Sequence, residues 1–297
     1  MMNFLSPPID RAKVYLLAGL VVVGVVRNAV GQLAPATRIV SVGSGGTAGN
    51  NDAHMPRISR SGRYVTFASA GGYGLVGGNR THIFVRDLGD DTLTYVSKTP
   101  AGNTANNDSF DPVISDDGRR VVFMSWATNL HPLDINGNAD VYFHDRQTNK
   151  TYLVSATPAG FSGNNVSTDP EMTPDGRYVV FRSQATDLVA SDANASFDVF
   201  RRDLLLEVTE IVSVDASGTQ AAAGSSFCSI SADGRWVAFQ SSANNLVGSE
   251  TDSFDDIFVK DMLTGAVEQI SIRHDGTMMN SRARLRSFPT MGRRSPT

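Results

Sequence analysis

The sequence predicts an all-β protein in which one four-stranded unit is repeated four times. The segment at 112–125, P-V-I-S-D-D-G-R-R-V-V-F-M-S, recurs in related form at 56–69, 170–183 and 228–241. Two markers keep the same step, a glycine at Gly62, Gly118, Gly176 and Gly234 and an aspartate at Asp87, Asp145, Asp203 and Asp261. The glycines are spaced 56, 58 and 58 residues apart, and the aspartates 58 residues apart. A fixed period of this kind indicates a repeat architecture.

Each unit contains four short apolar segments that are typical of strands. In the second unit these are 113–115, 120–125, 140–144 and 151–155. The glycine between the first two segments can take the positive φ that a tight hairpin needs. The second segment has apolar residues on both faces, which suits a strand between two neighbouring sheets. Stacking on copies of itself would bury both faces, and this predicts a β-propeller of four-stranded antiparallel blades.

The repeat markers divide residues 37–271 into four complete blades, at 43–97, 98–155, 156–213 and 214–271. Residues 37–42 read T-R-I-V-S-V, which is a fourth strand without its first three. We expect this segment to be an N-terminal clasp strand that completes the ring. The fourth blade has no successor, so we expect its outward face to be partly exposed, including Val237, Phe239 and Phe258.

Residues 1–36 are predicted to be a signal peptide or an N-terminal anchor. Arg11 and Lys13 make the region before residue 14 positively charged. An unbroken apolar run of thirteen residues, 14–26, follows them. A membrane span needs about 20 residues, so the run better suits the apolar region of a signal peptide, and A-P-A at 34–36 offers a cleavage site. In either case we expect a periplasmic or secreted protein, with membrane contact only through this segment if it is uncleaved.

The tail at 272–297 is predicted to be irregular. From residue 281 it reads S-R-A-R-L-R-S-F-P-T-M-G-R-R-S-P-T, which matches no strand pattern. Shifting the codon frame from Phe288 onward permits S-D-D-G-x-x-V-A-Y, close to the repeated motif. Our hypothesis is a frameshift near residue 280 that truncated a longer propeller. The alternative is a chance match, because most of these codons are permitted and not forced.

The repeated motif is P-x-I-S-x-D-G-R-x-V-x-F-x-S, followed by an aliphatic and aromatic strand that ends in aspartate. It resembles the TolB-type (WD-like) β-propeller repeat of exported bacterial proteins, over residues 37–271. The resemblance implies a binding or scaffolding module at the cell envelope, or a regulatory domain beside a hydrolase. This chain departs from the family pattern because it has four complete units where six or seven are usual.

We therefore expect a non-enzymatic exported module that binds a protein or glycan partner. The alternative is the propeller portion of a hydrolase or lyase whose catalytic part is missing, since the chain has no G-x-S-x-G motif. A net charge of −4 and the lack of a basic patch before the tail argue against nucleic-acid binding. The single cysteine, Cys228, cannot form an internal disulfide.

The loops between the second and third strands are candidates for calcium binding. Oxygen-bearing side chains alternate there in the second and third units, as Asp134, Asn136, Asn138 and Asp140, and as Asp192, Asn194, Ser196 and Asp198. Calcium takes six to eight oxygen ligands, commonly from flexible loops with this alternate spacing. The alternative is a polar loop whose side chains cap their own turns. No other cofactor is expected, and the five histidines lack metal-ligand spacing.

Overall fold

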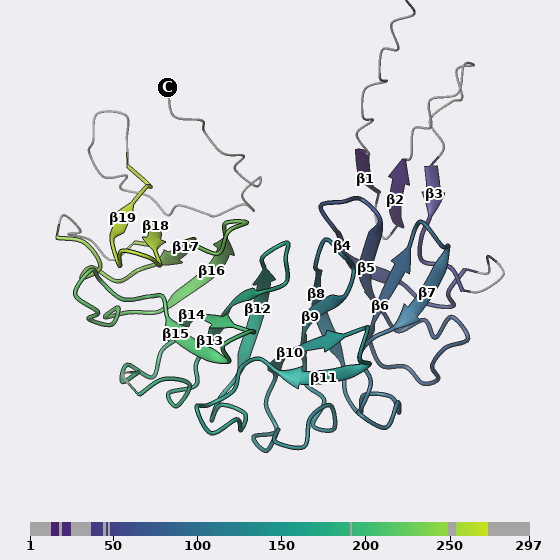
Figure 1. Cartoon of the computed structure of the whole chain (residues 1–297), viewed down its shortest axis with the longest axis horizontal. Helices are drawn as coiled ribbons and strands as arrows, with labels where there is room; N and C mark the ends of the chain where they lie inside the picture. Colours follow the sequence, from purple (N-terminus) through teal and green to yellow (C-terminus); the bar gives the residue numbers. More distant parts are fainter. Residues whose placement is uncertain are drawn as a thin grey trace, which may run out of the picture.

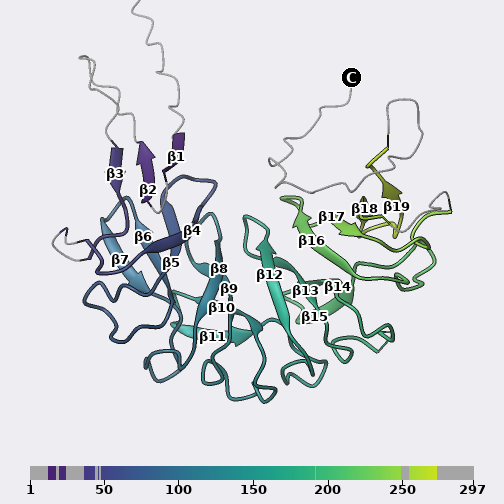
Figure 2. The same ribbon diagram turned by 180° about the vertical axis from the view of Figure 1, so that it is seen from behind.

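The computed structural model describes residues 13–17, 20–24, 37–43, 46, 48–190, 192–248 and 254–272. All regular elements in these ranges are strands, in four four-stranded antiparallel sheets and one three-stranded sheet. The four blades follow one another along an open arc (Figures 1 and 2). The predicted all-β architecture of four-stranded blades is confirmed. No described segment is a helix of the length and apolarity needed to cross a membrane.

Each blade contains four consecutive strands in chain order. Blade 1 consists of β4 (Ala53–Ile58), β5 (Tyr64–Ser69), β6 (His82–Asp87) and β7 (Thr92–Tyr95). Blade 2 consists of β8 (Ser109–Ile114), β9 (Arg120–Ser125), β10 (Asp140–Asp145) and β11 (Lys150–Leu153). Blade 3 consists of β12 (Ser167–Met172), β13 (Tyr178–Ser183), β14 (Asp198–Asp203) and β15 (Val208–Ile211). Blade 4 consists of β16 (Ser225–Ile230), β17 (Trp236–Ser241), β18 (Asp256–Asp261) and β19 (Val267–Gln269).

The first strand of every blade lies on the concave side of the arc, and the fourth strand lies on the convex side (Figure 1). The first strands β4, β8, β12 and β16 contact one another in succession. They begin several residues earlier than the sequence pattern predicts, because each contains a β-bulge that breaks the alternation of apolar and polar residues. These strands position the candidate functional site described below.

The hairpin between the first two strands follows the predicted chemistry. In blade 2, Gly118 has a φ of 71° and its N–H donates to the Ser115 carbonyl at 2.9 Å. The Asp117 carboxylate accepts from the Ser115 hydroxyl at 2.6 Å and from the Arg119 N–H at 2.9 Å. These bonds satisfy the turn locally, and the positive φ explains the recurrent glycine.

The arginine after the hairpin glycine pairs with the aspartate that ends the third strand of the same blade. Arg119 Nη2 lies 2.6 Å from Asp145 Oδ2, and the Asp145 carboxylate also accepts from the Gln147 N–H at 2.9 Å. The equivalent pairs are Arg63–Asp87, Arg177–Asp203 and Arg235–Asp261. In blade 2 these bonds lower the pKa of Asp145 to about 2. The recurrent arginine therefore ties two turns of one blade together.

A stacked aromatic pair fills the middle of every blade. The pairs are Phe67–Phe84, Phe123–Tyr142, Phe181–Phe200 and Phe239–Phe258, with ring centroids 5.7 to 6.0 Å apart. In blade 4, Phe239 and Phe258 pack in one cluster with Val180 and Val199 of blade 3, so they face the preceding blade. The expectation that Val237, Phe239 and Phe258 are partly exposed is wrong, because all three are 0% exposed.

The free side of blade 1 is covered from within the chain. Tyr73 packs edge-on against Phe67 and Phe84, at 5.8 and 5.0 Å between ring centroids. The Tyr73 hydroxyl donates to Ser69 Oγ at 3.0 Å, which satisfies its polar atom inside the cluster. This aromatic cap replaces the neighbouring blade that the other stacked pairs contact.

The predicted clasp strand is present as β3 (Thr37–Ile39), but it does not join blade 4. It pairs with β2 (Leu20–Gly24), which pairs with β1 (Lys13–Leu17), and these three strands form the extra sheet. Blade 4 supplies its own fourth strand, β19, so it has no vacancy for a strand from the N-terminus. The rest of the predicted signal segment 1–36 and the tail 273–297 lie outside the described residues.

Candidate functional site

The concave side of the arc carries the same backbone irregularity in every blade. Within each first-strand bulge one non-glycine residue has a positive φ, namely 52° at Met55, 50° at Asp111, 53° at Asp169 and 47° at Phe227. Such a conformation costs of order 1–3 kcal/mol per residue and persists where the surrounding structure enforces it. Bulges also re-aim the side chains next to them. The blades therefore present four strained residues at one repeat position along the concave side.

Charged side chains cluster at these bulges. Arg57 on β4 pairs with Glu171 on β12 at 2.8 Å, so the ion pair joins blade 1 to blade 3. Arg182 pairs with Asp169 at 2.6 Å. Asp111 is on β8 of blade 2, the blade between those that supply Arg57 and Glu171. It is half-buried, and its carboxylate has no ion-pair or hydrogen-bond partner among the described residues. Three blades thus contribute charges to one concave cluster.

Two carboxylates of this cluster, Asp111 and Glu171, are harder to ionise than usual. Burial raises the pKa of Asp111, and the nearby Asp169 charge raises it further, against the lowering effect of Arg57. Burial also raises the pKa of Glu171, with Arg57 again opposing the shift. A positively charged group from a ligand would stabilise the ionised forms of both carboxylates.

Sequence reasoning missed this cluster because the bulge hides it from a simple alternating pattern. A signal for it exists in the aligned units. The residue after the recurrent proline or Cys228 is Arg57, Val113, Glu171 or Ser229. The charge of this side chain therefore differs between units, although the surrounding motif is nearly the same in all four. Positions that vary inside a structural repeat are those that the repeat itself does not need.

The predicted calcium loop of blade 2 brings two carboxylates into the protein interior. Asp134 is 8% exposed and Asp140 is 0% exposed. Asp134 Oδ2 accepts from the Tyr142 hydroxyl at 2.6 Å, and Asp140 Oδ1 accepts from the Ser155 hydroxyl at 2.6 Å. Burial raises the pKa of Asp140 to about 7, and the Asp134 charge adds to the shift.

The two asparagines of this loop form turn bonds. Asn136 Nδ2 donates to Asp140 Oδ2 at 2.8 Å and to the Gly163 carbonyl at 2.6 Å. Asn136 Oδ1 accepts from the Asn138 N–H at 2.6 Å, and these three bonds fix the orientation of the amide. The Asn136 side chain therefore caps its own turn, as the alternative interpretation of the loop predicts.

Blade 3 repeats the arrangement with one substitution. Gln220 Nε2 bridges Asp192 Oδ1 at 2.7 Å and Asp198 Oδ2 at 2.8 Å, while the Ser213 hydroxyl donates to Asp198 Oδ1 at 2.5 Å. Burial raises the pKa of Asp198 to about 6. The Ser196 N–H donates to Asn194 Oδ1 at 2.8 Å, which again is a turn cap.

One feature of both loops suits a cation. Asp134 Oδ1 and Asp192 Oδ2 are buried oxygens that find no hydrogen-bond partner within the described ranges. However, hydroxyl groups and side-chain amides already donate to the other carboxylate oxygens. In the described part of the chain, no group of three or more His, Cys, Asp or Glu side chains is arranged to hold a metal ion. Calcium binding at these loops stays a prediction.

If the loops bind calcium, the affinity should be weak, roughly 0.1–1 mM as in extracellular modules. Free calcium at about ten times Kd should then raise the unfolding free energy by about 1.4 kcal/mol per site. A calorimetric melt with and without calcium measures this for wild type and for Asp134→Ala combined with Asp192→Ala. The exposed Asp52→Ala is the control. Equal shifts in wild type and the double variant would mean that these loops are ordinary capped turns.

No protein-family model matches the sequence, and no curated protein matches it. The structure is similar to TolB from Acinetobacter baumannii, at 18% identity and a TM-score of 0.49 over 84% of this chain and 48% of that protein. A putative TolB from Agrobacterium tumefaciens gives 19% identity and a TM-score of 0.49, over 84% of this chain and 73% of that one.

A prolyl endopeptidase structure gives 12% identity and a TM-score of 0.50, over 84% of this chain and 32% of that protein. The chain spans about half the length of the A. baumannii protein. At such identities a likeness concerns the fold alone. Taken with the four antiparallel four-stranded sheets, the prolyl endopeptidase match identifies the fold of this chain as a β-propeller.

Proposed function

We propose that this chain is a non-enzymatic binding module that holds a protein partner through the concave side of its blades, after export to the cell envelope. The observation that carries the proposal is the concave charged cluster, in which Arg57 and Glu171 pair across two blades beside the unpaired Asp111. A site drawn from several blades and built once is what a binding surface requires, whereas the Arg–Asp pairs of every blade serve the fold.

The chemistry of the cluster selects the partner. Asp111, Asp169 and Glu171 supply three carboxylates, and burial and mutual repulsion raise the pKa of two of them. A lysine, an arginine or a free amino terminus of a protein segment would relieve that repulsion. Met55 and Phe227, at the same strained repeat position, are 42% and 54% exposed and would supply apolar contacts.

A photo-crosslinking experiment tests this proposal. Phe227 is replaced by a photoreactive phenylalanine analogue, and Leu263, which is 76% exposed on a turn of blade 4, is replaced as the control. We expect an envelope protein to be captured from position 227 and not from 263. Asp111→Asn should reduce the yield several-fold, because it removes the unpaired carboxylate.

Equal capture from both positions, or a yield that Asp111→Asn leaves unchanged, would contradict the proposal. Capture of a polysaccharide instead of a protein would assign the concave side to a glycan. Chemical conversion of the captured ligand by the purified chain would favour the alternative, that this is the propeller portion of a hydrolase or lyase.

A further inference from the structure

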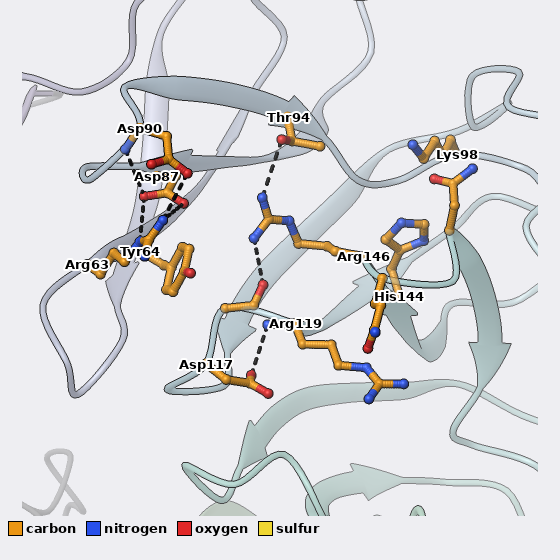
Figure 3. A pocket seen from close by; sticks show the side chains of 13 residues that line it. Arg63, Tyr64, Asp87, Asp90, Thr94, Lys98, Asp117, Arg119, His144 and Arg146 are labelled. Atoms are coloured by element: carbon orange, nitrogen blue, oxygen red, sulfur yellow. Dashed lines mark hydrogen bonds and ion pairs between the residues drawn. The ribbon is translucent and has the colours of Figure 1, made fainter.

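A polar pocket of about 550 Å³ lies where blade 1 meets blade 2. Tyr64 and Thr94 line it from blade 1, and His144 and Arg146 line it from blade 2. Lys98, in the linker between the two blades, completes this side of the wall. Figure 3 shows Arg146 extending across the pocket toward Thr94, with Lys98 and His144 beside each other. The volume is within the range typical of small-molecule sites.

Most charges of the pocket neutralise one another. Arg63 Nε lies 2.8 Å from Asp87 Oδ1, and Arg63 Nη2 also reaches Asp90 Oδ2 at 2.9 Å. Arg119 pairs with Asp145, and Asp117 caps the hairpin that precedes Arg119. Every pocket carboxylate is therefore already bonded within the protein.

Two cations in the pocket have no carboxylate partner among the described residues, Lys98 and Arg146. The Lys98 ammonium makes no hydrogen bond there, and burial together with the Arg146 charge lowers the pKa of Lys98. Arg146 Nη1 donates to the Gly118 carbonyl at 2.6 Å, and the guanidinium lies over the Tyr64 ring at 5.6 Å. Neither contact is with a carboxylate, so Lys98 and Arg146 have no ion-pair partner among the described residues, while Asp87, Asp90 and Asp117 lie elsewhere along the pocket wall.

Arg146 occupies a position that is apolar in the other blades. Leu88, Leu204 and Met262 stand there, each packed against a core cluster. The backbone is the same in all four blades, because this residue always donates its N–H to the carbonyl of the recurrent arginine, at 2.8 or 2.9 Å. The fold therefore accepts an apolar side chain here, and does not itself require a cation.

Lys98 shows the same contrast. Val42, Ala156 and Val214 stand at its position in the other units. The N–H of Lys98, Ala156 and Val214 donates in each case to the carbonyl two residues earlier, at 2.7 or 2.8 Å. Placing two unpaired cations at half-buried positions costs free energy, and both such substitutions occur at one junction.

The space in the pocket has a local cause. In blades 1 and 4 the residue equivalent to His144 is long, and it donates to the preceding linker, as Arg86 does to the Val40 carbonyl and Lys260 does to the Val214 carbonyl, both at 3.0 Å. His144 is shorter and bonds Thr151 Oγ1 at 3.0 Å instead. The volume that the longer side chain would fill is therefore open in blade 2.

We propose that this pocket is an oxyanion-binding site that takes a carboxylate, phosphate or sulfate group of a small ligand between Lys98 and Arg146. An ammonium and a guanidinium are the side chains that bind oxyanions most strongly. The Thr94 hydroxyl and the Gln147 and Asn149 amides line the remaining wall and can donate to the rest of the ligand. The site is separate from the concave charged cluster, so it stands or fails independently of the proposed function.

Thermal unfolding at constant ionic strength tests the proposal. The probes are inorganic phosphate, inorganic sulfate and glucuronate, with glucose as the neutral counterpart of glucuronate. We expect at least one oxyanion to raise the Tm saturably and glucose to leave it unchanged. Lys98→Ala and Arg146→Leu install the residues of blade 3 at these positions, so they keep the repeat's own packing. Each should raise the Kd at least about tenfold, the loss of about 1.4 kcal/mol or more expected for one charge-assisted bond.

Arg80→Ala is the matched control, because Arg80 is an exposed cation of blade 1 that lies outside the pocket lining and donates to the Asn107 side chain. It should leave the Kd unchanged. Titration calorimetry repeats the measurement without reliance on unfolding, should a variant prove too unstable to melt. The proposal is overturned if no oxyanion binds saturably, or if Lys98→Ala and Arg146→Leu bind as wild type does. The arm that saturates at the lowest concentration identifies the oxyanion.

Discussion

Phe181→Ala is expected to lower the free energy of unfolding by about 3–5 kcal/mol, the usual cost of removing a buried phenylalanine. Phe181 is 0% exposed and stacks on Phe200 with ring centroids 5.8 Å apart. It also packs in one cluster with Val122 and Val141 of blade 2. The substitution would therefore leave a cavity between blades 2 and 3, where each blade stabilises its neighbour.

Urea denaturation followed by circular dichroism measures this effect. Phe161→Ala is the matched control, because Phe161 is 41% exposed in a linker. That change should alter the unfolding free energy by less than about 0.5 kcal/mol. A loss of under 1 kcal/mol for Phe181→Ala would show that the blades do not depend on one another for stability.

The second large effect is on the pH dependence of stability, through Asp140 and Asp198. Burial raises the pKa of Asp140 to about 7 and that of Asp198 to about 6, whereas an unfolded aspartate titrates near 3.9. The folded state thus holds protons that the unfolded state releases. The stability from each group is fully present below about pH 4 and is lost as the pH rises through the folded pKa.

Relative to Asp140→Asn, the wild type should therefore lose on the order of 3 kcal/mol of stability between pH 5 and pH 8. For Asp198→Asn the corresponding figure is about 1 kcal/mol, because its folded pKa is lower. Comparing each variant with wild type at every pH removes the opposite effect of His144, whose pKa burial lowers to about 4. The contribution of His144 to the stability of the protein decreases as the pH falls.

Urea denaturation at several pH values, with a chelator present, measures these differences. Asp52→Asn, at an exposed position, should run parallel to wild type across the range. If Asp140→Asn also runs parallel to wild type, the Asp140 carboxyl does not titrate above its ordinary range in the folded protein.

Much of the repeat could be predicted from residues that act locally. Gly118 adopts the positive φ that its hairpin needs, and the predicted second strand at 120–125 is β9 without change. The third strand, predicted at 140–144, extends by one residue as β10. Hairpin chemistry and apolar runs depend on near neighbours in the chain, so the sequence alone displays them.

Local sequence patterns could not predict which face of each blade contacts the preceding blade. Phe239 and Val237 alternate with Ala238 and Gln240 along β17, and the pattern alone does not say which face meets the preceding blade. In the structure Phe239 packs with Val180 and Val199 of blade 3. The face that blade 4 leaves without a successor is therefore the one with Ala238 and Gln240.

The candidate sites divide along the same line. The loop carboxylates Asp134 and Asp140 stand close in the sequence, and their alternation was visible there, although their hydrogen-bond partners Tyr142 and Ser155 were not. The concave cluster and the oxyanion pocket join residues of different blades. Such contacts depend on how the blades stack, and a local sequence pattern does not predict the stacking.

The sequence by itself determined the repeat, the four-stranded blade and the hairpin that recurs in each, because periodic burial and turn geometry are properties of short segments. Only the tertiary structure decided that Arg57 meets Glu171 across 114 residues of chain and that Arg146 and Lys98 share one pocket. Because the blades stack, residues that differ between the repeats are brought close together in the folded protein. Lys98 and Arg146 are single substitutions in the sequence, but in the described part of the fold they are two cations of one pocket, and neither has an ion-pair partner there.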